Sequence, residues 1–482
     1  MDTLAFEHHL TSPQGRGRLD PDGFQALAGG GSCCDRIRFS VTVQHDHVVD
    51  AGFAAEGCGA ATAAASAAVT LVRGRGLLDA ACVGPTEIAS ELGGLSPGKL
   101  HAAELAADAL HRALGEAARR AGALPAGART LVAMSGGVDS SVAALLCARD
   151  GGAVAVTLEL WADPENDAER SCCSASAVAQ ARRLAHSLGL PHFTLDLRRE
   201  FRAGVVEPFI AGYGAGETPN PCVGCNGHVR LDAMLALADR LGCRRLATGH
   251  YARVAEAGHP DGPLLRQAAD AAKDQTYMLA ALAPESLDRM RFPLGELTKP
   301  QVREIAARAG LPVAAKADSQ DLCFLAGTDR ARFLARHGGV GERPGELRHA
   351  DGRLLGEHRG QHRFTVGQRR GLGVFSTEPL FVLDKDGPSN RVTVGPREAL
   401  ETRTVRLRGV RLHRDGARVR SVKLRYRSRA LDASLAGPSV PAGRHRALTL
   451  RLAESVDGAA PGQLGCLLDG DLVVGWGTIT RA

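Results

Sequence analysis

No stretch of this sequence is long and apolar enough to cross a membrane. The longest uncharged run, residues 57–72, consists mostly of Ala and Gly and falls short of the ~20 apolar residues that a spanning helix needs. Residues 1–9 have neither the basic start nor the apolar centre of a signal peptide. We therefore expect a cytoplasmic protein without membrane association.

The composition also lacks the bias of disordered or collagen-like chains, since 44% of the residues are hydrophobic and 23% are charged. The length of 482 residues predicts three or four domains, at ~100–200 residues each. The net charge is only +6, but residues 403–429 hold ten Arg and one Lys against a single acid, Asp415. This run fits either a solvated face or a nucleic-acid-binding surface.

Twelve cysteines are many for a chain in a reducing compartment. Structural disulfides are not expected there, so the clustered cysteines favour metal or sulfur chemistry. Adjacent thiols ligate one ion poorly, and we expect Cys172 and Cys173 in a loop. Four further cysteines are expected in the core: Cys82, Cys147, Cys243 and Cys466.

The pattern of apolar residues divides the chain into several α/β and β-rich parts. Residues 36–49 predict two strands joined by a turn, and residues 60–72 and 101–120 predict helices. These elements suggest an α+β domain over residues 1–122, followed by a small Pro/Gly-punctuated linker at 123–128.

Strands and helices then alternate, which predicts a parallel sheet of the nucleotide-binding type over residues 129–326. The predicted strands are 130–134, 153–160 and 192–197, and the predicted helices are 138–149 and 175–188. We expect a small central domain at 327–374 and a β-barrel at 375–482. The predicted strands of this β-rich tail are 379–383, 391–394, 418–427, 445–452 and 472–476.

Residues 135–141, Ser-Gly-Gly-Val-Asp-Ser-Ser, stand between a predicted strand and a predicted helix. The glycines let backbone approach a phosphate, and the serine hydroxyls and helix N–H groups then face the anion. Asp139 is placed to hold Mg²⁺ or to orient a serine. The Gly-Lys-Ser/Thr of a Walker loop is missing, which is compatible with cleavage of ATP at the α-phosphate. A plain Gly-rich turn is the alternative. The motif resembles the PP-loop ATP pyrophosphatase superfamily.

A Cys-x-x-Cys pair, Cys222 and Cys225, lies in a turn that two prolines make rigid. Such a pair permits thiolate formation, metal binding or redox exchange. Cys323, far along the chain, is alone a candidate buried hydrophobe. A closed zinc site would need a second Cys/His pair nearby. Three converging thiolates with one open position would suit a 4Fe–4S cluster.

Together these segments resemble the bacterial tRNA-specific 2-thiouridylases over residues 129–482. The matching motifs are 135–141, 220–222 with 225–226, 247–252, 273–277, 292–296, Cys323 and 365–369. That family replaces the C2 oxygen of the wobble uridine in certain tRNAs by sulfur, after ATP adenylates the oxygen and pyrophosphate leaves.

The resemblance implies roles for individual residues. Cys225 and Cys323 would be the catalytic pair, with Cys323 carrying a persulfide sulfur and Cys225 activating or resolving it. Alternatively, they would ligate a 4Fe–4S cluster with Cys222. The implied ATP contacts are Ala133, Met134, Ser135, Gly136, Gly137, Val138, Asp139, Ser140, Leu158 and Gly249.

Two further sets follow from the same resemblance. The implied target-base contacts are Asn220, Pro221 and Cys222, and the implied tRNA contacts are His250, Lys273, Asp274, Gln275, Arg425, Tyr426 and Gln463. Well-known members have Asp where this chain has Cys222, which weakens an acid–base role there and strengthens the three-thiolate interpretation. A sulfur-donor protein such as a cysteine desulfurase is the implied partner beside tRNA.

The first ~120 residues resemble iron–sulfur cluster scaffold proteins of the NifU type. Cys33, Asp35, Cys58 and His101 match that family's ligands, but Ala102 replaces its third Cys and Cys34 replaces a Gly. The remaining four residues could hold Zn²⁺ or a labile cluster, or the domain could serve docking alone. Fusion suggests that this part supplies cluster or sulfur to the cysteines downstream.

Two other functions remain open at this point. One is a different PP-loop enzyme that adenylates a small molecule, although it would not need Cys225, Cys323 and a basic β-rich tail. The other is an iron–sulfur carrier, for which the intact loop at 135–141 would have no use.

Overall fold

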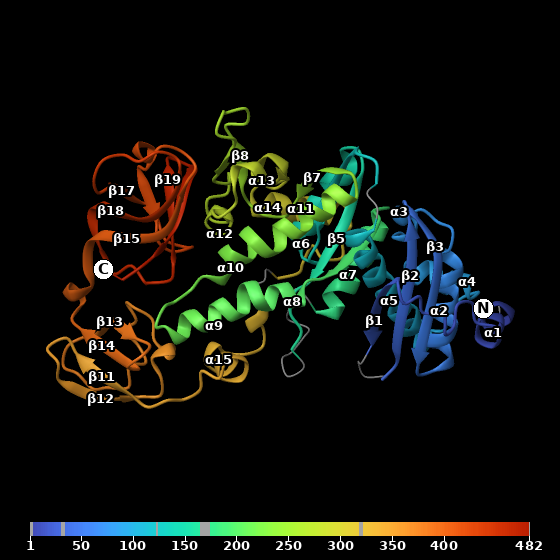
Figure 1. Cartoon of the computed structure of the whole chain (residues 1–482), viewed down its shortest axis with the longest axis horizontal. Helices are drawn as coiled ribbons and strands as arrows, with labels where there is room; N and C mark the ends of the chain where they lie inside the picture. The colour runs from blue at the N-terminus through green and yellow to red at the C-terminus, as the bar shows by residue number, and fades with distance from the viewer. Residues whose placement is uncertain (1–2, 30–33, 122–123, 164–173, 318–321, 482) are drawn as a thin grey trace.

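The computed structural model describes residues 3–29, 34–121, 124–163, 174–317 and 322–481 (Figure 1). Cys33, Cys172 and Cys173 lie outside the described residues. The chain is mixed α/β with several parts, as the sequence predicts. Within the described residues, no helix is long and apolar enough to span a membrane.

The N-terminal part is an antiparallel sheet in the order β1-β2-β3, covered by helices. Its strands are β1 (Phe24–Gly29), β2 (Arg36–Gln44) and β3 (His47–Glu56), and its helices are α1 (Thr3–Thr11), α2 (Gly59–Val72), α3 (Leu77–Ala80), α4 (Pro85–Glu91) and α5 (Leu100–Arg120). Ile37, Phe39 and Val41 alternate along β2 and are fully buried, which is the pattern of a half-buried strand. The predicted strands and helices of this part are present.

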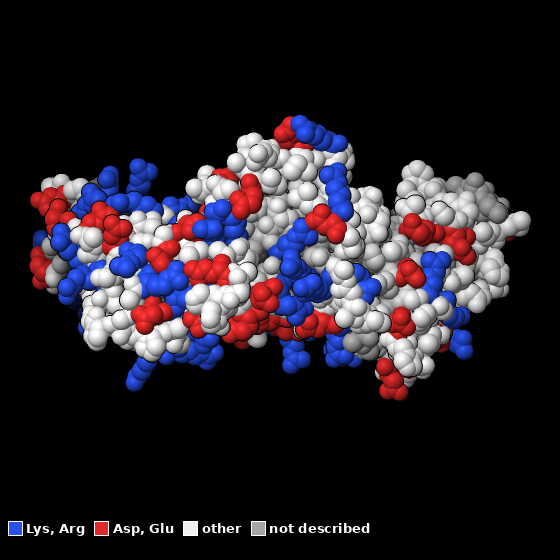
Figure 2. Space-filling model, turned by 90° about the horizontal axis from the view of Figure 1, so that it is seen from above, with Lys and Arg blue, Asp and Glu red and all other residues white. Residues whose placement is uncertain are grey.

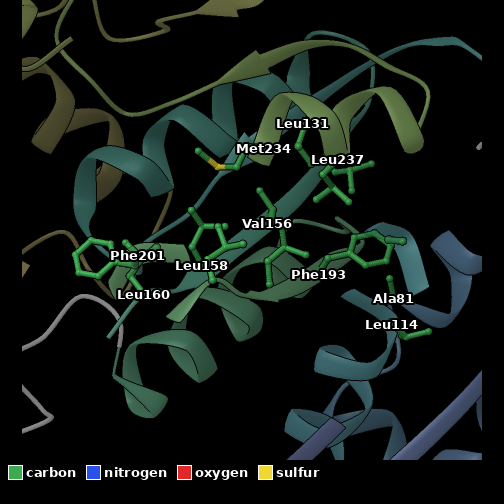
Figure 3. Packing of buried hydrophobic residues seen from close by; sticks show 14 of the residues in the cluster. Ala81, Leu114, Leu131, Val156, Leu158, Leu160, Phe193, Phe201, Met234 and Leu237 are labelled. Atoms are coloured by element: carbon green, nitrogen blue, oxygen red, sulfur yellow. The ribbon is translucent and has the colours of Figure 1, made fainter. Parts of the chain in front are cut away.

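Helix α5 packs on the N-terminal sheet and on the central sheet. Its C-terminal half packs on β6 (His192–Asp196), and a Cβ atom at Gly115 would lie 2.0 Å from the carbonyl oxygen of Thr194. Leu114 and Ala81 belong to the same core as Val156 and Phe193 (Figure 3). The hydrophobic core therefore runs without interruption from the first 120 residues into the next part.

The central sheet is parallel, with strand order β10-β7-β4-β5-β6. Its other strands are β4 (Gly127–Ala133), β5 (Ala153–Glu159), β7 (Cys243–Ala247) and β10 (Met290–Arg291), and its helices include α6 (Val138–Arg149), α7 (Ala175–Ser187), α11 (Leu231–Arg240) and α14 (Lys299–Arg308). Every residue of β5 is buried, as in a central parallel strand. The predicted alternation is confirmed.

Two β-structures complete the chain. Strands β11 (Gly345–His349), β12 (Leu354–His358), β13 (Phe381–Asp386) and β14 (Arg391–Gly395) form one sheet. The barrel contains β15 (Glu401–Leu412), β16 (Ser421–Lys423), β17 (Leu431–Leu435), β18 (Gly443–Asp457), β19 (Leu464–Asp469) and β20 (Leu472–Ile479). It closes because β15 pairs with both β18 and β20.

The basic run begins on a strand whose side chains alternate between core and solvent. Val405, Leu407, Val410 and Leu412 of β15 are buried, so the intervening arginines face outward. The strand predicted at 418–427 is shorter than expected, because β16 ends at Lys423 and a turn follows. The Ser428 hydroxyl closes that turn by donating to the Arg425 carbonyl over 2.9 Å.

The segment read as a linker is held to its surroundings at its second half. The backbone N–H of Leu124 donates to Arg240, and Gly127 already belongs to β4 and donates to Gly242. These two hydrogen bonds attach the end of the predicted linker to the end of α11 and the turn after it.

Candidate functional site

The glycine-rich loop lies between the end of β4 and the start of α6. Gly136 has φ +69°, a left-handed conformation that glycine adopts without strain. The Ser140 hydroxyl accepts a hydrogen bond from the Ser135 N–H (3.1 Å) and lies 3.2 Å from the Gly137 carbonyl oxygen, to which it donates. The helix N-terminus therefore presents free N–H groups to the space above the sheet.

Gly249, which follows β7, touches this helix start. A Cβ atom at Gly249 would lie 2.7 Å from the backbone nitrogen of Ser140 and 2.8 Å from the carbonyl carbon of Asp139. Backbone cannot yield as a flexible side chain can, so only glycine fits. The predicted contact residue Gly249 and the loop 135–140 are thus parts of one structure.

The Asp139 carboxylate accepts hydrogen bonds from Lys299 and Tyr251. The Nζ atom of Lys299 lies 2.7 and 2.8 Å from the two oxygens, and the Tyr251 hydroxyl lies 2.9 Å from Oδ1. Lys299 is largely buried. The structure therefore surrounds Asp139 with a cation and a phenol, a pairing that the sequence motif did not indicate.

A second lysine reaches the loop from far along the chain. The Nζ atom of Lys316 donates to the Gly136 carbonyl oxygen (3.0 Å) and to Oε1 of Gln180 on α7 (2.9 Å). Lys316 lies seven residues before Cys323. No motif marks Lys316, so its place shortly before Cys323 is the one feature of the sequence that could have pointed to it.

One cavity of about 1820 Å³ joins the loop to the cysteines. Its lining includes most of the residues that the resemblance implied for ATP, base and tRNA contact. Those that line it are Ala133, Met134, Ser135, Gly137, Val138, Asp139, Ser140, Leu158, Gly249, Pro221, Cys222, Cys225, Cys323, His250, Lys273, Asp274, Gln275 and Tyr426. Gly136, Asn220, Arg425 and Gln463 are not among the lining residues.

The Cys-x-x-Cys pair lies on α10 (Pro221–Gly224) and the π-helix η4 (Cys225–Arg230). Asn220 caps α10, since its side-chain oxygen accepts the Cys222 N–H over 3.1 Å. Asn226 donates to the Met278 carbonyl over 3.2 Å. These two hydrogen bonds hold the backbone segment that carries both cysteines.

Cys225 is buried, and Cys222 and Cys323 are half-buried. Among the described residues, they do not form a group whose ligand atoms all lie within 4.8 Å. Such spacing suits a single ion with bonds of ~2.0–2.3 Å, whereas a multi-iron cluster needs wider spacing. The geometry is thus compatible with both the persulfide and the cluster interpretation.

His250 lines the cavity in its neutral form. Burial, with a smaller contribution from Arg230, lowers the pKa of His250 to about 3. Its Nδ1 atom lies 2.9 Å from the Thr248 hydroxyl. A neutral imidazole offers one donor and one acceptor, so His250 contributes hydrogen bonding rather than charge.

Asp274 and Gln275 organise their own loop. The Asp274 carboxylate accepts the Thr276 hydroxyl (2.8 Å) and the Ala268 N–H (3.1 Å), and Gln275 Oε1 accepts the Tyr251 N–H (3.0 Å). These bonds give both residues a structural role beside Lys273.

Gln463 and its neighbours hold the chain that leads into the cysteine turn. The Gln463 amide donates to the Thr218 carbonyl (2.7 Å), and the Thr218 N–H donates to Pro461 (2.8 Å). The barrel therefore positions the segment immediately before Asn220. Tyr426, from the β16–β17 turn, reaches the cavity wall beside Arg427 and Arg429.

Basic side chains are plentiful over the barrel end of the molecule but are interspersed with acids (Figure 2). Ion pairs engage part of the basic run: Arg408 with Glu217, Arg414 and Arg418 with Glu256, and Arg429 with Glu454. The run is therefore partly a paired surface and partly a rim of the cavity.

A second constellation lies in the N-terminal part, where one ligand atom each of Asp35, Cys58 and His101 lie within 4.8 Å. Cys58 Sγ lies 3.0 Å from Asp35 Oδ2, and the Cys58 thiol lowers the pKa of Asp35. His101 Nδ1 lies 2.9 Å from the Gly98 carbonyl oxygen, which leaves Nε2 as the ligand nitrogen. This donor set fits a transition-metal ion.

Neighbouring positions explain the departures from the scaffold pattern. Ala102 has no ligand atom in its side chain and is fully buried in α5. Cys34 has φ +56°, a conformation natural for the usual Gly. A Cβ atom at Gly57 would lie 2.0 Å from Asp35 Oδ1, so glycine is required beside the site.

The two sites are connected through α5. Glu104, three residues beyond His101, pairs with Arg183 over 2.7 Å, and Arg183 lines the large cavity. Arg182 is fully buried and binds both Asp108 and Glu104. The N-terminal part is thereby fixed against the wall of the cavity.

Three family models match the chain. They are described as the NifU-like N terminal domain (residues 4–123), the tRNA methyl transferase HUP domain (128–327) and the tRNA methyl transferase PRC-barrel domain (331–396). The bifunctional protein NifU/MnmA of Rubrobacter xylanophilus is 42% identical over 489 residues, which cover 98% of this chain and 97% of its own. The tRNA-specific 2-thiouridylase MnmA of Xanthobacter autotrophicus is 44% identical over 376 residues, covering 74% of this chain and 94% of its own.

Proposed function

We propose, from the premise that this chain belongs to the family of bifunctional NifU/MnmA proteins, that it is an ATP-dependent tRNA-uridine 2-sulfurtransferase acting on the wobble position. The observation that carries this proposal is the single cavity shared by the phosphate-binding loop and Cys222, Cys225 and Cys323. A small-molecule adenylating enzyme would need only the part of that cavity that the phosphate-binding loop lines.

The first step activates a poor leaving group. The uridine C2 oxygen attacks the α-phosphorus of ATP, and pyrophosphate leaves. Loop N–H groups and Ser135 bind the phosphates, while Lys316 adds a positive charge where a Walker lysine is missing. Lys299 holds Asp139, which would ligate Mg²⁺ if the ion neutralises the phosphates here.

The second step transfers sulfur. In the persulfide route, the terminal sulfur of Cys323-S-S⁻ attacks C2, and AMP leaves with its electron pair. The Cys225 thiolate then attacks the inner sulfur, releasing the thiolated uridine and forming a Cys225–Cys323 disulfide. An external thiol must reduce this disulfide before the next turnover. In the cluster route, Cys222, Cys225 and Cys323 would hold a 4Fe–4S group, which would supply the sulfide for transfer.

The N-terminal site supplies cargo in this proposal. Asp35, Cys58 and His101, with Cys33 as a fourth candidate, would hold Zn²⁺ or a labile cluster. The ion pair between Glu104, on the helix that carries His101, and Arg183 of the cavity lining supports delivery of sulfur or cluster within one chain. A cysteine desulfurase is the proposed donor to this part.

The enzymatic proposal is tested with unmodified tRNA, ATP and a persulfide donor. Pyrophosphate release is expected to require tRNA, and 2-thiouridine, measured by nucleoside mass spectrometry, is expected to require tRNA, ATP and the persulfide donor. A Cys82→Ser control should retain both pyrophosphate release and thiolation, since Cys82 is a half-buried free thiol that does not line the cavity. Pyrophosphate release with a small molecule in place of tRNA would overturn the proposal.

The scaffold proposal is tested by point substitution rather than truncation, because removing residues 1–120 would expose the core under α5. Asp35→Ala and Cys58→Ser are expected to abolish metal bound by the N-terminal part, measured by elemental analysis after anaerobic purification. Cys82→Ser should leave the metal content unchanged. Metal content independent of Asp35 and Cys58 would reduce this part to a docking element.

A further inference from the structure

The segment between η6 (Gln361–Arg363) and β13 carries a motif, residues 365–369, to which the reaction above assigns no role. The segment is a built loop. Gln368 Oε1 accepts the Thr365 N–H (3.0 Å), its amide donates to the Arg370 carbonyl (2.8 Å), and its backbone pairs with Val382 of β13. Buried Phe364, Leu372 and Leu380 anchor the loop in a small core.

This anchored loop presents an unusual group of side chains at its tip. Phe375 is completely exposed, and it is the aromatic member of the exposed large hydrophobic residues in the described part of the chain. Arg369 and Arg370 are also exposed, and Glu378 is the one acid between Gly367 and Leu380. Arg369 and Phe375 line one surface pocket, and cations on a loop that also exposes an aromatic ring are the elements of a single-stranded nucleic-acid contact.

The loop is continuous with the cavity rim. A Cβ atom at Gly367 (φ +87°) would lie 3.5 Å from Nη2 of Arg425. Tyr426, the next residue, lines the cavity, and Val366 packs in a cluster with Leu400 and Ala460 at the barrel. A polyanion bound at Tyr426 and Arg425 would therefore meet Arg369 and Arg370 next.

We propose that residues 367–375 are a tRNA-binding loop, in which Arg369 and Arg370 bind backbone phosphates and the Phe375 ring stacks on an unpaired base. This inference rests on the proposed function, because it extends the surface on which tRNA approaches the cavity. RNA suits the surface because phosphates complement the arginines and splayed bases stack on aromatic rings.

The experiment measures tRNA affinity of the full chain across a salt series. Arg369→Gln/Arg370→Gln is expected to weaken binding about tenfold and to lower the slope of log Kd against log salt by between one and two. Phe375→Ala is expected to weaken binding about 5- to 100-fold with the slope unchanged. Pyrophosphate release at saturating tRNA should stay at the wild-type rate.

Two matched controls come from the neighbouring β11–β12 turn. Arg353→Gln removes a side chain that is 70% exposed, and Leu354→Ala removes an apolar residue that is 56% exposed. Both should bind tRNA like wild type. A photo-crosslinking residue at position 375 should label tRNA, with competition by unlabelled tRNA.

The outcomes separate the loop from the reaction. Wild-type protein that thiolates tRNA, together with loop variants of unchanged affinity and salt slope, would overturn the loop proposal alone. Loop variants that change self-association or capture of a protein, with tRNA binding intact, would overturn it in favour of protein docking. Wild-type protein that neither binds nor thiolates tRNA would instead overturn the proposed function.

Discussion

The ammonium of Lys316 donates a hydrogen bond to the carbonyl oxygen of Gly136, 180 residues earlier in the chain. The contact places a cation at the phosphate-binding loop from the same segment that leads to Cys323. A positive charge at this position can stabilise the negative charge that develops on the departing pyrophosphate.

Lys316→Met is therefore expected to lower tRNA-dependent pyrophosphate release by about 10²-fold, the size typical for losing one transition-state donor. Lys316→Arg should recover part of the rate. The loss should appear in kcat with tRNA affinity unchanged. A Lys316→Met enzyme with the wild-type rate would show that the lysine only braces the loop.

Gly249→Ala is expected to abolish ATP binding, because the new methyl group would lie 2.7 Å from the Ser140 nitrogen and displace the helix start. ATP affinity measured by calorimetry tests this. Gly214→Ala is the control, since a Cβ atom there has no neighbour within 4 Å and α9 (Glu207–Gly214) tolerates alanine. Equal ATP affinity in the two variants would contradict the close approach.

Arg182→Met is expected to lower the free energy of unfolding by about 3 kcal/mol, because Glu104 and Asp108 lose a buried partner. Urea denaturation measures the change. Arg308→Met is the control, since its side chain is 78% exposed and pairs with Glu304 along one helix; its effect should stay within about 0.5 kcal/mol. Similar values for both would mean that α5 is only loosely docked.

Stability is expected to fall as the pH falls below His413's ordinary pKa. Burial lowers the pKa of His413 to about 4 from 6.5, so between these values the unfolded chain binds a proton that the folded chain refuses. Lowering the pH from 7 to 5 should cost about 2 kcal/mol more in wild type than in His413→Gln. Parallel pH profiles for the two proteins would remove His413 as the cause.

Local patterns predicted the elements that local sequence determines. The loop 135–141 carries its own strand, glycines and helix start, and the predicted β4–α6 unit is present. Lys299 and Lys316 could not be found in this way, because tertiary packing alone brings them to the loop. The motif at 247–252 likewise did not indicate that Tyr251 binds Asp139. Gln463 illustrates the same limit: its amide holds Thr218, a partner 245 residues away.

The pattern of apolar residues also did not indicate that the N-terminal part packs on the central sheet. The Ala-rich face of α5 fits a helix of one small domain, and sequence cannot reveal that Gly115 lies against β6. The strand expected at 418–427 ended early because Ser428 closes a turn around Arg425. In both places, a backbone contact that the local sequence pattern does not reveal determined the structure.

The most direct test of the central claim separates the two steps within the shared cavity. Cys323→Ser enzyme is assayed with ATP, unmodified tRNA and a persulfide donor, and both pyrophosphate and 2-thiouridine are measured. Our account predicts tRNA-dependent pyrophosphate release near the wild-type rate with no 2-thiouridine formed. Wild-type amounts of 2-thiouridine from this variant would contradict it.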